Sequence, residues 1–238
     1  MSYVIINGKK SSLVKGLLIQ SLPIISKPLL RSKIEEIDGR DGDIITKLGY
    51  AAYDKTVKIG LFGDYDVDEV IRFFNQSGKV IFSNEPDKFY KFDILNQIDF
   101  EKLLRFKQAD VTFHCQPFKY SAVDDSLTFN TTGLNQIKIF NRGNVESRPR
   151  ISFTASGNVA IYLSLNGTQI LVFTAANQTI VIDGEKMNAY IGTSLANRSV
   201  SGDYNKLRLL PGENTISWTN AYEGSLTQIT VENFARWI

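Results

Sequence analysis

The stretch that decides the fold is Val159-Ala160-Ile161-Tyr162-Leu163-Ser164-Leu165-Asn166-Gly167, followed by a second apolar run at residues 170–173. Val, Ile and Leu occupy every odd position from 159 to 165, so these side chains face one side of a strand, while those between them face the other. The Asn-Gly pair accepts positive φ at both central positions of a tight turn, which makes it a strong signal for a β-hairpin. The stretch therefore predicts two antiparallel strands of a half-buried sheet.

The rest of the second half repeats this strand-and-turn pattern. Turns are expected at Asp183-Gly184, Pro211-Gly212 and Glu223-Gly224. The expected strands between them span residues 179–182, 186–191, 206–210, 214–218 and 226–231. Short strands with turn signals at this spacing and no helical pattern predict a β-sandwich of jelly-roll type.

The first half is also mostly β, with one helix. Its expected strands span residues 3–7, 16–22, 29–37, 43–48, 55–62, 79–83, 89–98 and 103–115. The apolar side chains of residues 67–77 instead follow the i, i+3, i+4, i+7 spacing of an amphipathic helix. Asp66 and Glu69 predict a capped start for this helix, and Gly78 predicts its end. We therefore expect an α+β unit, a β-sandwich or split barrel that carries one helix.

Length and charge predict two domains. A chain of 238 residues usually forms two units that each bury a core of their own. Residues 130–238 contain 9 Lys/Arg and 7 Asp/Glu, so they account for the whole formal charge of +2, and residues 1–129 are charge-dense but neutral. This change in composition falls in the polar stretch 124–133 and predicts domains at residues 1–129 and 130–238.

Composition also excludes several classes of protein. A net charge of +2 gives no electrostatic basis for tight binding to nucleic acid. The longest apolar stretch, residues 16–25, is interrupted by polar residues and is too short to span a bilayer, so no membrane insertion is expected. The N-terminus lacks the pattern of a secretory signal, and the single cysteine, Cys115, cannot form an intramolecular disulfide. Folding in a cytoplasm is expected.

No catalytic or metal-binding set is expected. His114 and Cys115 are neighbours on a predicted strand, so their side chains point to opposite faces and cannot form a dyad. Asp64, Asp66 and Asp68 repeat the first acids of a calcium loop, but the required glycine and the final glutamate of that loop are missing, and helix capping accounts for the acids. We predict a protein that is not an enzyme and has no cofactor.

A second acidic stretch, Asp38-Gly39-Arg40-Asp41-Gly42-Asp43, invites comparison with a phosphate-binding loop. It lacks the spacing of that loop, and no helical pattern follows it. Glycine supplies positive φ in tight turns, so the stretch is interpreted as a turn between two charged strands.

Several short motifs occur in a fixed order along the chain. They are residues 28–42 (ending in Ile-Asp-Gly-Arg-Asp-Gly), Phe73-Phe74-Asn75-Gln76-Ser77-Gly78, residues 82–90, Phe113-His114-Cys115-Gln116-Pro117-Phe118, Asn141-Arg142-Gly143-Asn144, Ser147-Arg148-Pro149, Ser156-Gly157 and residues 210–216. In order and spacing they resemble the distal tail protein (Dit) family of long-tailed bacteriophages over nearly the whole chain.

The resemblance implies a structural hub at the distal end of the tail tube. It implies that the first domains of six copies close into a ring, and that the second domains project outward. The implied partners are further copies of the chain, the tail tube protein, a tail-associated or tail-tip protein and a receptor-binding protein. Double-stranded DNA would pass through the ring without specific binding. The implied location is the virion tail tip, after assembly in the cytoplasm of the host bacterium.

Two sets of residues are candidates for contacts. Arg40 and Asp41, in the turn between the two charged strands, are expected to pair at the interface between copies. Tyr204, Trp218 and Tyr222 could form a platform on which a saccharide stacks, although aromatic residues of a sandwich more often lie in its core.

A different class of function stays open from the residues alone. The jelly-roll-like second domain also resembles galectins and carbohydrate-binding modules, so the alternative is a carbohydrate-binding β-sandwich protein or a glycan-processing enzyme at the cell surface. Glycosidases need two carboxylates across the scissile bond. The adjacent Asp124 and Asp125 and the turn residues Asp183 and Glu185 make no persuasive pair.

Overall fold

The structure is a computed structural model that describes residues 2–95, 98–232 and 235–238. The chain divides into two compact units, Met1–Ala122 together with Ile238, and Val123–Trp237. Both units consist mainly of strands, which confirms the predicted mainly β class. Sequence analysis placed the boundary at residues 129/130, within strand β10 (Leu127–Asn130), which pairs with β20 (Ser225–Glu232) of the second unit.

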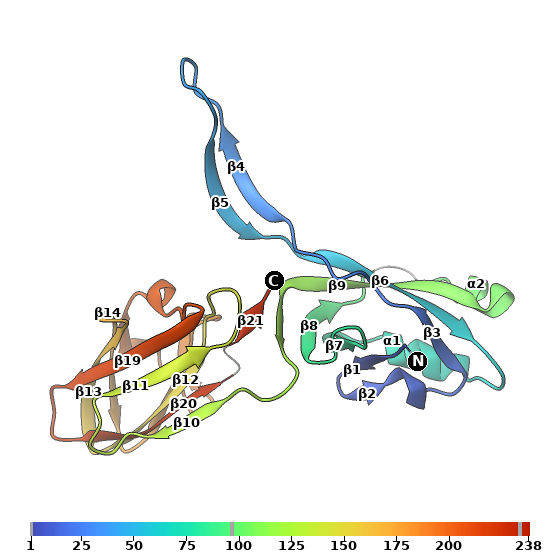
Figure 1. The fold of residues 1–238 in the computed structure, drawn as a ribbon. Coiled ribbons are helices and arrows are strands. Elements are labelled where there is room, and N and C mark those ends of the chain that lie inside the picture. The colour runs from blue at the N-terminus through green and yellow to red at the C-terminus, as the bar shows by residue number, and fades with distance from the viewer. Residues whose placement is uncertain (1, 96–97, 233–234) are drawn as a thin grey trace. The chain divides into compact units, whose positions relative to one another are not determined.

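The first unit is built on one curled sheet (Figure 1). Its strands are β1 (Val4–Ile6), β2 (Lys9–Lys10), β3 (Leu17–Ser21), β6 (Tyr53–Leu61), β7 (Gly78–Phe82), β8 (Lys88–Asp93) and β9 (Gln108–Ser121), and a short 3-10 helix at Ser11–Leu13 follows β2. They lie in the order β2-β1-β7-β8-β9-β6-β3. Alternate residues of β6 and β9 are buried, as period-two patterning requires of a sheet with one face on a core.

The predicted helix is present as α1 (Val67–Phe74). Its cap is Asp66, whose side chain accepts a hydrogen bond from the backbone N–H of Glu69 at 3.2 Å. The predicted end at Gly78 was wrong: the helix ends at Phe74, and Gly78 begins β7. The side chain of Glu69 completes no capping box, because it pairs with Lys9 instead.

A second helix was missed by the sequence analysis. α2 (Phe100–Phe106) occupies part of a segment predicted as strand from residue 103 onward. Asp99 caps it by accepting from the N–H of Lys102 at 2.7 Å, and Lys107 ends it with φ of 57°. The alternation of β9 starts only after this left-handed residue, so an apolar run that crosses a helix end was interpreted as one strand.

Two further strands, β4 (Leu30–Glu35) and β5 (Ile44–Tyr50), form a separate two-stranded sheet. We call residues 30–50 the arm. In Figure 1 the arm extends away from the curled sheet of the first unit. The turn at its tip contains Gly39 and Gly42, with φ of 78° and 76°, as predicted for a tight turn.

The second unit is a β-sandwich, as predicted. Its strands are β10, β11 (Gln136–Asn141), β12 (Arg150–Ser156), β13 (Asn158–Leu165), β14 (Thr168–Ala176), β15 (Thr179–Asp183), β16 (Asn188–Ile191), β17 (Ser194–Leu195), β18 (Val200–Gly202), β19 (Gly212–Asn220) and β20, with a final short strand β21 (Arg236–Trp237). One sheet has the order β10-β20-β12-β15-β16-β17 and the other β11-β19-β13-β14-β18.

The stretch that decides the fold is confirmed in detail. β13 and β14 form the expected hairpin, and Asn166 and Gly167 take φ of 50° and 81°. The side chains at 159, 161, 163 and 165 are buried in the core of the sandwich. One expected strand, residues 206–210, was wrong: Tyr204–Lys206 is a 3-10 turn, and Leu209 makes an isolated bridge to Ser147.

Phe113 lies at the centre of the core of the first unit. Its ring contacts those of Phe74, Phe82 and Phe92, with centroids 6.4, 5.5 and 5.1 Å away. The contacted rings come from α1, β7 and β8, so one side chain on β9 joins the helix to the sheet. Edge-to-face geometry adds to the free energy gained from burial.

None of the helices in the described part of the chain combines the length and the apolar character that a membrane crossing needs.

Replacing Phe113 with Ala is expected to lower the free energy of unfolding by about 3–5 kcal/mol, because it leaves a cavity among three rings. Urea unfolding followed by circular dichroism measures the change. Leu13→Ala, at an exposed position of the same unit, is the control and should cost about 1 kcal/mol or less. Equal losses for the two variants would contradict the central place of Phe113.

Candidate assembly surfaces

The arm exposes apolar side chains that it cannot bury by itself. Ile34 and Ile45 lie directly opposite each other in the β4–β5 register. Their exposed fractions are 58% and 59%, and Ile37 and Leu48 are also exposed. Within the described chain, β4 and β5 pair only with each other. A lone two-stranded hairpin is at best marginally stable in water, so this surface is suited to contact with another molecule.

The tip of the arm is acidic. Residues 35–43 contain five carboxylates, and Arg40 is their one basic residue. Arg40 and Asp41, the predicted interface pair, both lie exposed in the tip turn. The structure thus presents them to solvent, on a segment whose charge is strongly biased to one sign.

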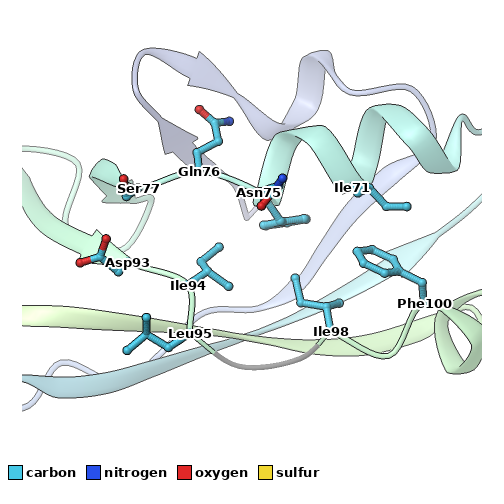
Figure 2. A pocket seen from close by; sticks show the side chains of 10 residues that line it. Ile71, Asn75, Gln76, Ser77, Asp93, Ile94, Leu95, Ile98 and Phe100 are labelled. Atoms are coloured by element: carbon cyan, nitrogen blue, oxygen red, sulfur yellow. The ribbon is translucent and has the colours of Figure 1, made fainter.

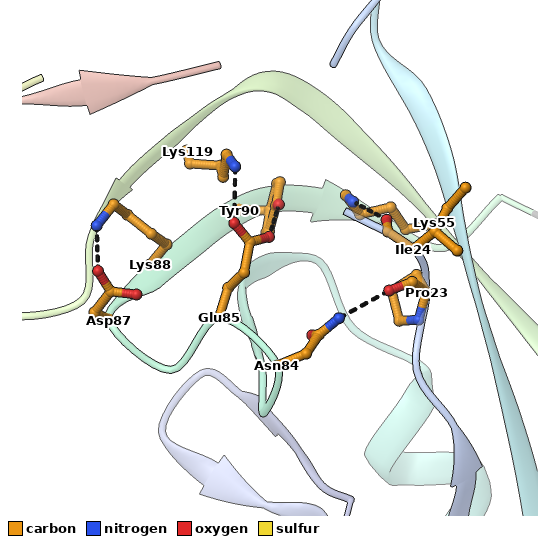
Figure 3. Close-up of polar contacts among 9 residues, drawn as sticks. All are labelled: Pro23, Ile24, Lys55, Asn84, Glu85, Asp87, Lys88, Tyr90 and Lys119. Carbon is orange, nitrogen blue, oxygen red and sulfur yellow. Dashed lines mark hydrogen bonds and ion pairs between the residues drawn. The ribbon is translucent and has the colours of Figure 1, made fainter. Parts of the chain in front are cut away.

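Two side chains, Asn84 and Lys55, hold the segment that leads into the arm by hydrogen bonds to its backbone carbonyls. We call these two contacts the clasp. Asn84 donates a hydrogen bond to the carbonyl of Pro23 at 2.9 Å, and Lys55 donates to the carbonyl of Ile24 at 3.1 Å (Figure 3). The ammonium group of Lys55 also lies 5.0 and 4.8 Å from the ring centroids of Tyr53 and Tyr90. Two successive carbonyls are therefore fixed to the sheet where the chain leaves it.

The burial of Lys55 has a desolvation cost. The residue is almost completely buried on β6, and burial lowers the pKa of its ammonium group. A buried cation is tolerated only when its donors and its charge find partners. The Ile24 carbonyl and the two aromatic faces supply them.

A buried ion pair lies beside the clasp. Lys119 Nζ and Glu85 Oε1 are 2.8 Å apart, and their side chains are 9% and 13% exposed. The hydroxyl of Tyr90 donates to the other carboxylate oxygen of Glu85 at 2.5 Å (Figure 3). Burial raises the pKa of Tyr90 well above its usual range, so this hydroxyl remains a donor at any physiological pH. Both oxygens of the carboxylate are satisfied.

The other end of the arm returns to the sheet through an aromatic contact. Tyr50, the last residue of β5, meets Phe118 of β9 with ring centroids 5.7 Å apart and planes at 79°. The N–H of Ala51 donates to the carbonyl of Leu29 at 2.8 Å, which closes the base of the hairpin. Both chains of the arm are therefore anchored at its root.

A cavity in the first unit is lined mainly by apolar and neutral polar side chains. It has a volume of about 480 Å³ and lies between the end of α1 and the connection from β8 to α2 (Figure 2). Its apolar walls include Ile71, Ile94 and Phe100, and Asn75 and Asp93 lie at its polar side. Asp93 is the single carboxylate among the residues that line it.

The structure keeps His114 and Cys115 apart. His114 is partly exposed and its Nδ1 lies 2.8 Å from Asp54 Oδ1, whereas Cys115 is fully buried. Burial raises the pKa of the Cys115 thiol to about 12, so the nucleophilic thiolate is not formed at neutral pH. No grouping of three or more His, Cys, Asp or Glu able to hold a metal is found in the described residues.

The three residues of the predicted aromatic platform differ in exposure. Trp218 is 7% exposed and belongs to the core of the sandwich. Tyr204 packs against the same core, and burial raises the pKa of its hydroxyl. Tyr222 alone stands out, 61% exposed. It lines an open hollow of about 1050 Å³ together with Ser156, Asn158, Glu223 and Ser225.

Two features of these surfaces escaped the sequence analysis. The clasp and the ion pair beside it join residues far apart in the chain, such as Lys55 with Ile24 and Lys119 with Glu85, and no local pattern marks such pairs. The exposure of Ile34 and Ile45 was hidden because an apolar residue in a strand is normally assigned to a core. Of the features of the sequence, only the high charge density of the arm indicated that this hairpin is exposed.

The first unit is similar to a known protein family. Residues 12–115 match the family described as the phage tail protein RIFT-related domain. A search of curated proteins finds no match.

Solved structures share the fold of the whole chain. The crystal structure of the Dit protein of phage SPP1, described as a paradigm of the hub adsorption apparatus in phages that infect Gram-positive bacteria, has a TM-score of 0.70 at 17% identity, with 100% of both chains covered. A chain of the phage P2 baseplate in its activated conformation with Ca has a TM-score of 0.54 at 10% identity, covering 100% of this chain and 99% of that one.

The resemblance to the distal tail protein family, predicted from the ordered motifs, is confirmed by these matches.

The buried ion pair of Lys119 and Glu85 leads to a prediction about stability. Lys119→Met keeps the aliphatic stem but leaves the buried carboxylate of Glu85 without its cation, so it should lower the free energy of unfolding by about 3 kcal/mol. Lys9→Met removes a cation from the more exposed pair with Glu69, which has an N–O distance of 2.9 Å, and should cost less than about 1 kcal/mol. Chemical denaturation of both variants tests this, and a Lys119→Met variant as stable as Lys9→Met would contradict it.

Proposed function

We propose that the chain, as a phage tail protein whose fold follows that of a Dit hub protein along its whole length, forms the ring-shaped hub at the distal end of a tail tube. The observation that carries the proposal is the full-length fold match, together with the family match on the first unit. In this proposal six copies close into a ring through their first units, and the protein has no catalytic role.

The arm supports the ring. A ring of identical subunits needs a heterologous contact, in which two different patches of each subunit meet. The arm supplies one such patch, because its apolar side chains and its acidic tip lie outside the core of the first unit. Arg40 and Asp41 are proposed to take part in this contact, each with a charged residue of the neighbouring copy.

The charge of the chain suits a channel for DNA. Each phosphate neutralised by a protein releases counterions and strengthens binding, so a strongly basic wall would retain the DNA. Residues 1–129 have a formal charge of zero. A ring of such units would let double-stranded DNA pass without specific binding.

The remaining partners follow from the position of a hub. The proposed ring meets the tail tube protein on one side and a tail-associated or tail-tip protein on the other. The second unit is proposed to carry the receptor-binding protein. The proposed location is the tail tip of the virion, after assembly in the host cytoplasm.

A second candidate function concerns the second unit, whose hollow beside Tyr222 favours contact with a saccharide. An exposed aromatic ring offers a stacking face, while Ser156, Asn158 and Glu223 offer hydroxyl, amide and carboxylate partners for sugar hydroxyls. Trp218 and Tyr204 would not contact the saccharide and would only stabilise the sandwich on which the hollow lies. The hub proposal does not depend on this contact.

The purified chain is expected to form a closed ring with a mass about six times the 26.8 kDa of one copy. Size-exclusion chromatography with light scattering measures the mass, and negative-stain microscopy shows whether a central opening is present. The double variant Arg40→Ala, Asp41→Ala should shift the assembly toward single copies. A chain that stays monomeric at high concentration, or that turns over a glycan, would refute the hub.

Glycan binding provides a separate prediction. If the hollow binds a saccharide, a glycan array probed with the full chain should give specific signals that Tyr222→Ala removes. Tyr162→Ala, which changes a 41% exposed tyrosine outside the hollow, is the matched control and should leave the signals intact. An array without signals would remove the saccharide contact and leave the hub untouched.

A further inference from the structure

A second exposed apolar surface lies at the end of α2. Phe106, the last residue of α2, is 62% exposed, and Phe62, which follows β6, is 57% exposed. The two segments are joined where the N–H of Leu61 donates to the carbonyl of Lys107 at 3.1 Å. Leu104 is also exposed. We call Phe62, Lys102, Leu104, Arg105 and Phe106 the helix-end patch.

The helix-end patch contains two cations, whereas the tip of the arm is acidic. Lys102 and Arg105 are both exposed on α2, and the guanidinium of Arg105 lies 5.3 Å from the ring centroid of Phe106. Asp99 and Glu101 lie at the start of this helix, next to Lys102, whereas Arg105 lies in its last turn. The patch therefore carries two cations beside its exposed apolar side chains, and the tip of the arm carries five carboxylates and one arginine.

The two surfaces lie at opposite ends of the same strands. β6 begins at Tyr53, just after the arm, and ends at Leu61, beside the helix-end patch. In its antiparallel pairing with β9, Tyr53 faces Cys115 and Gly60 faces Gln108, the first residue after α2 and Lys107. At about 3.3 Å per residue, the nine residues of β6 hold the two surfaces roughly 30 Å apart. One copy cannot bring its own arm root onto its own patch.

We propose that the arm of one copy docks on the helix-end patch of the next copy. Ile34 and Ile45 would bury against Phe62 and Phe106, and the acidic tip would lie over Lys102 and Arg105. The contact joins different surfaces at opposite ends of the subunit, so it is head-to-tail and can close into a ring. The inference rests on the proposed hub and names the surface that receives the arm.

The alternative pairing, arm against arm, is opposed by charge. Two tips that each contain five carboxylates and one arginine would face like with like, and juxtaposed like charges weaken a contact. The helix-end patch offers the same apolar character with the complementary charge.

Reversing the charges tests the contact. Glu36→Lys with Asp38→Lys makes the tip basic, and Lys102→Glu with Arg105→Glu makes the patch acidic. Each double variant alone should need at least about tenfold more protein for half assembly, measured by light scattering at low salt. Arg198→Glu, an exposed reversal in the second unit, should assemble like the unchanged chain. Circular dichroism and the unfolding midpoint verify that each variant is folded.

Mixing the two double variants gives the decisive result. The basic tip of one variant fits the acidic patch of the other, and their unchanged surfaces also fit, so the equimolar mixture should form rings in which the variants alternate. Native mass spectrometry counts the copies of each. If either double variant assembles as readily alone as the unchanged chain, or if the mixture shows no gain, the inference is overturned while the hub stands. If the unchanged chain is monomeric, both are overturned.

Discussion

The arm is a two-stranded sheet, and each of its strands pairs only with the other in the described chain. Its side chains therefore have no second layer to pack against, and this constraint shapes the first unit. Ile34 and Ile45 face each other and remain more than half exposed. The hairpin must therefore be held at its root by the body of the unit and stabilised along its length by something else. The structure supplies the first requirement in full, and an assembly of copies would supply the second.

The root is held by buried polar contacts rather than by apolar packing alone. Lys55 and Asn84 bind successive carbonyls of the incoming chain, and the ion pair of Lys119 with Glu85 lies beside them. Buried charges of this kind add little net stability, but each contact has a defined direction and fails when a partner is missing. This geometry suits a segment that must leave the body of the unit at a fixed place.

The proposed hub function relies on surfaces, and the ionisable groups described above have structural roles. The lone thiol is buried with its pKa raised to about 12, and the aspartates before α1 serve as a helix cap and in an ion pair with Lys15. The fold matches a Dit hub protein at only 17% identity. At such low sequence identity, a shared fold does not show which residues have which role. The contact surfaces are therefore inferred from the exposed residues of this chain.

The sequence by itself determined what local periodicity and turn chemistry encode: the β13–β14 hairpin at Asn166-Gly167, the sandwich, the cap at Asp66 and the resemblance carried by ordered motifs. The sequence does not show where α2 ends and β9 begins. The apolar residues change there from helical to strand periodicity across Lys107, whose left-handed conformation no local pattern marks. Only the tertiary structure decided which apolar residues are buried, placing Trp218 in a core and Ile45 in solvent. Burial depends on which strands meet, and those pairings join residues far apart in the chain.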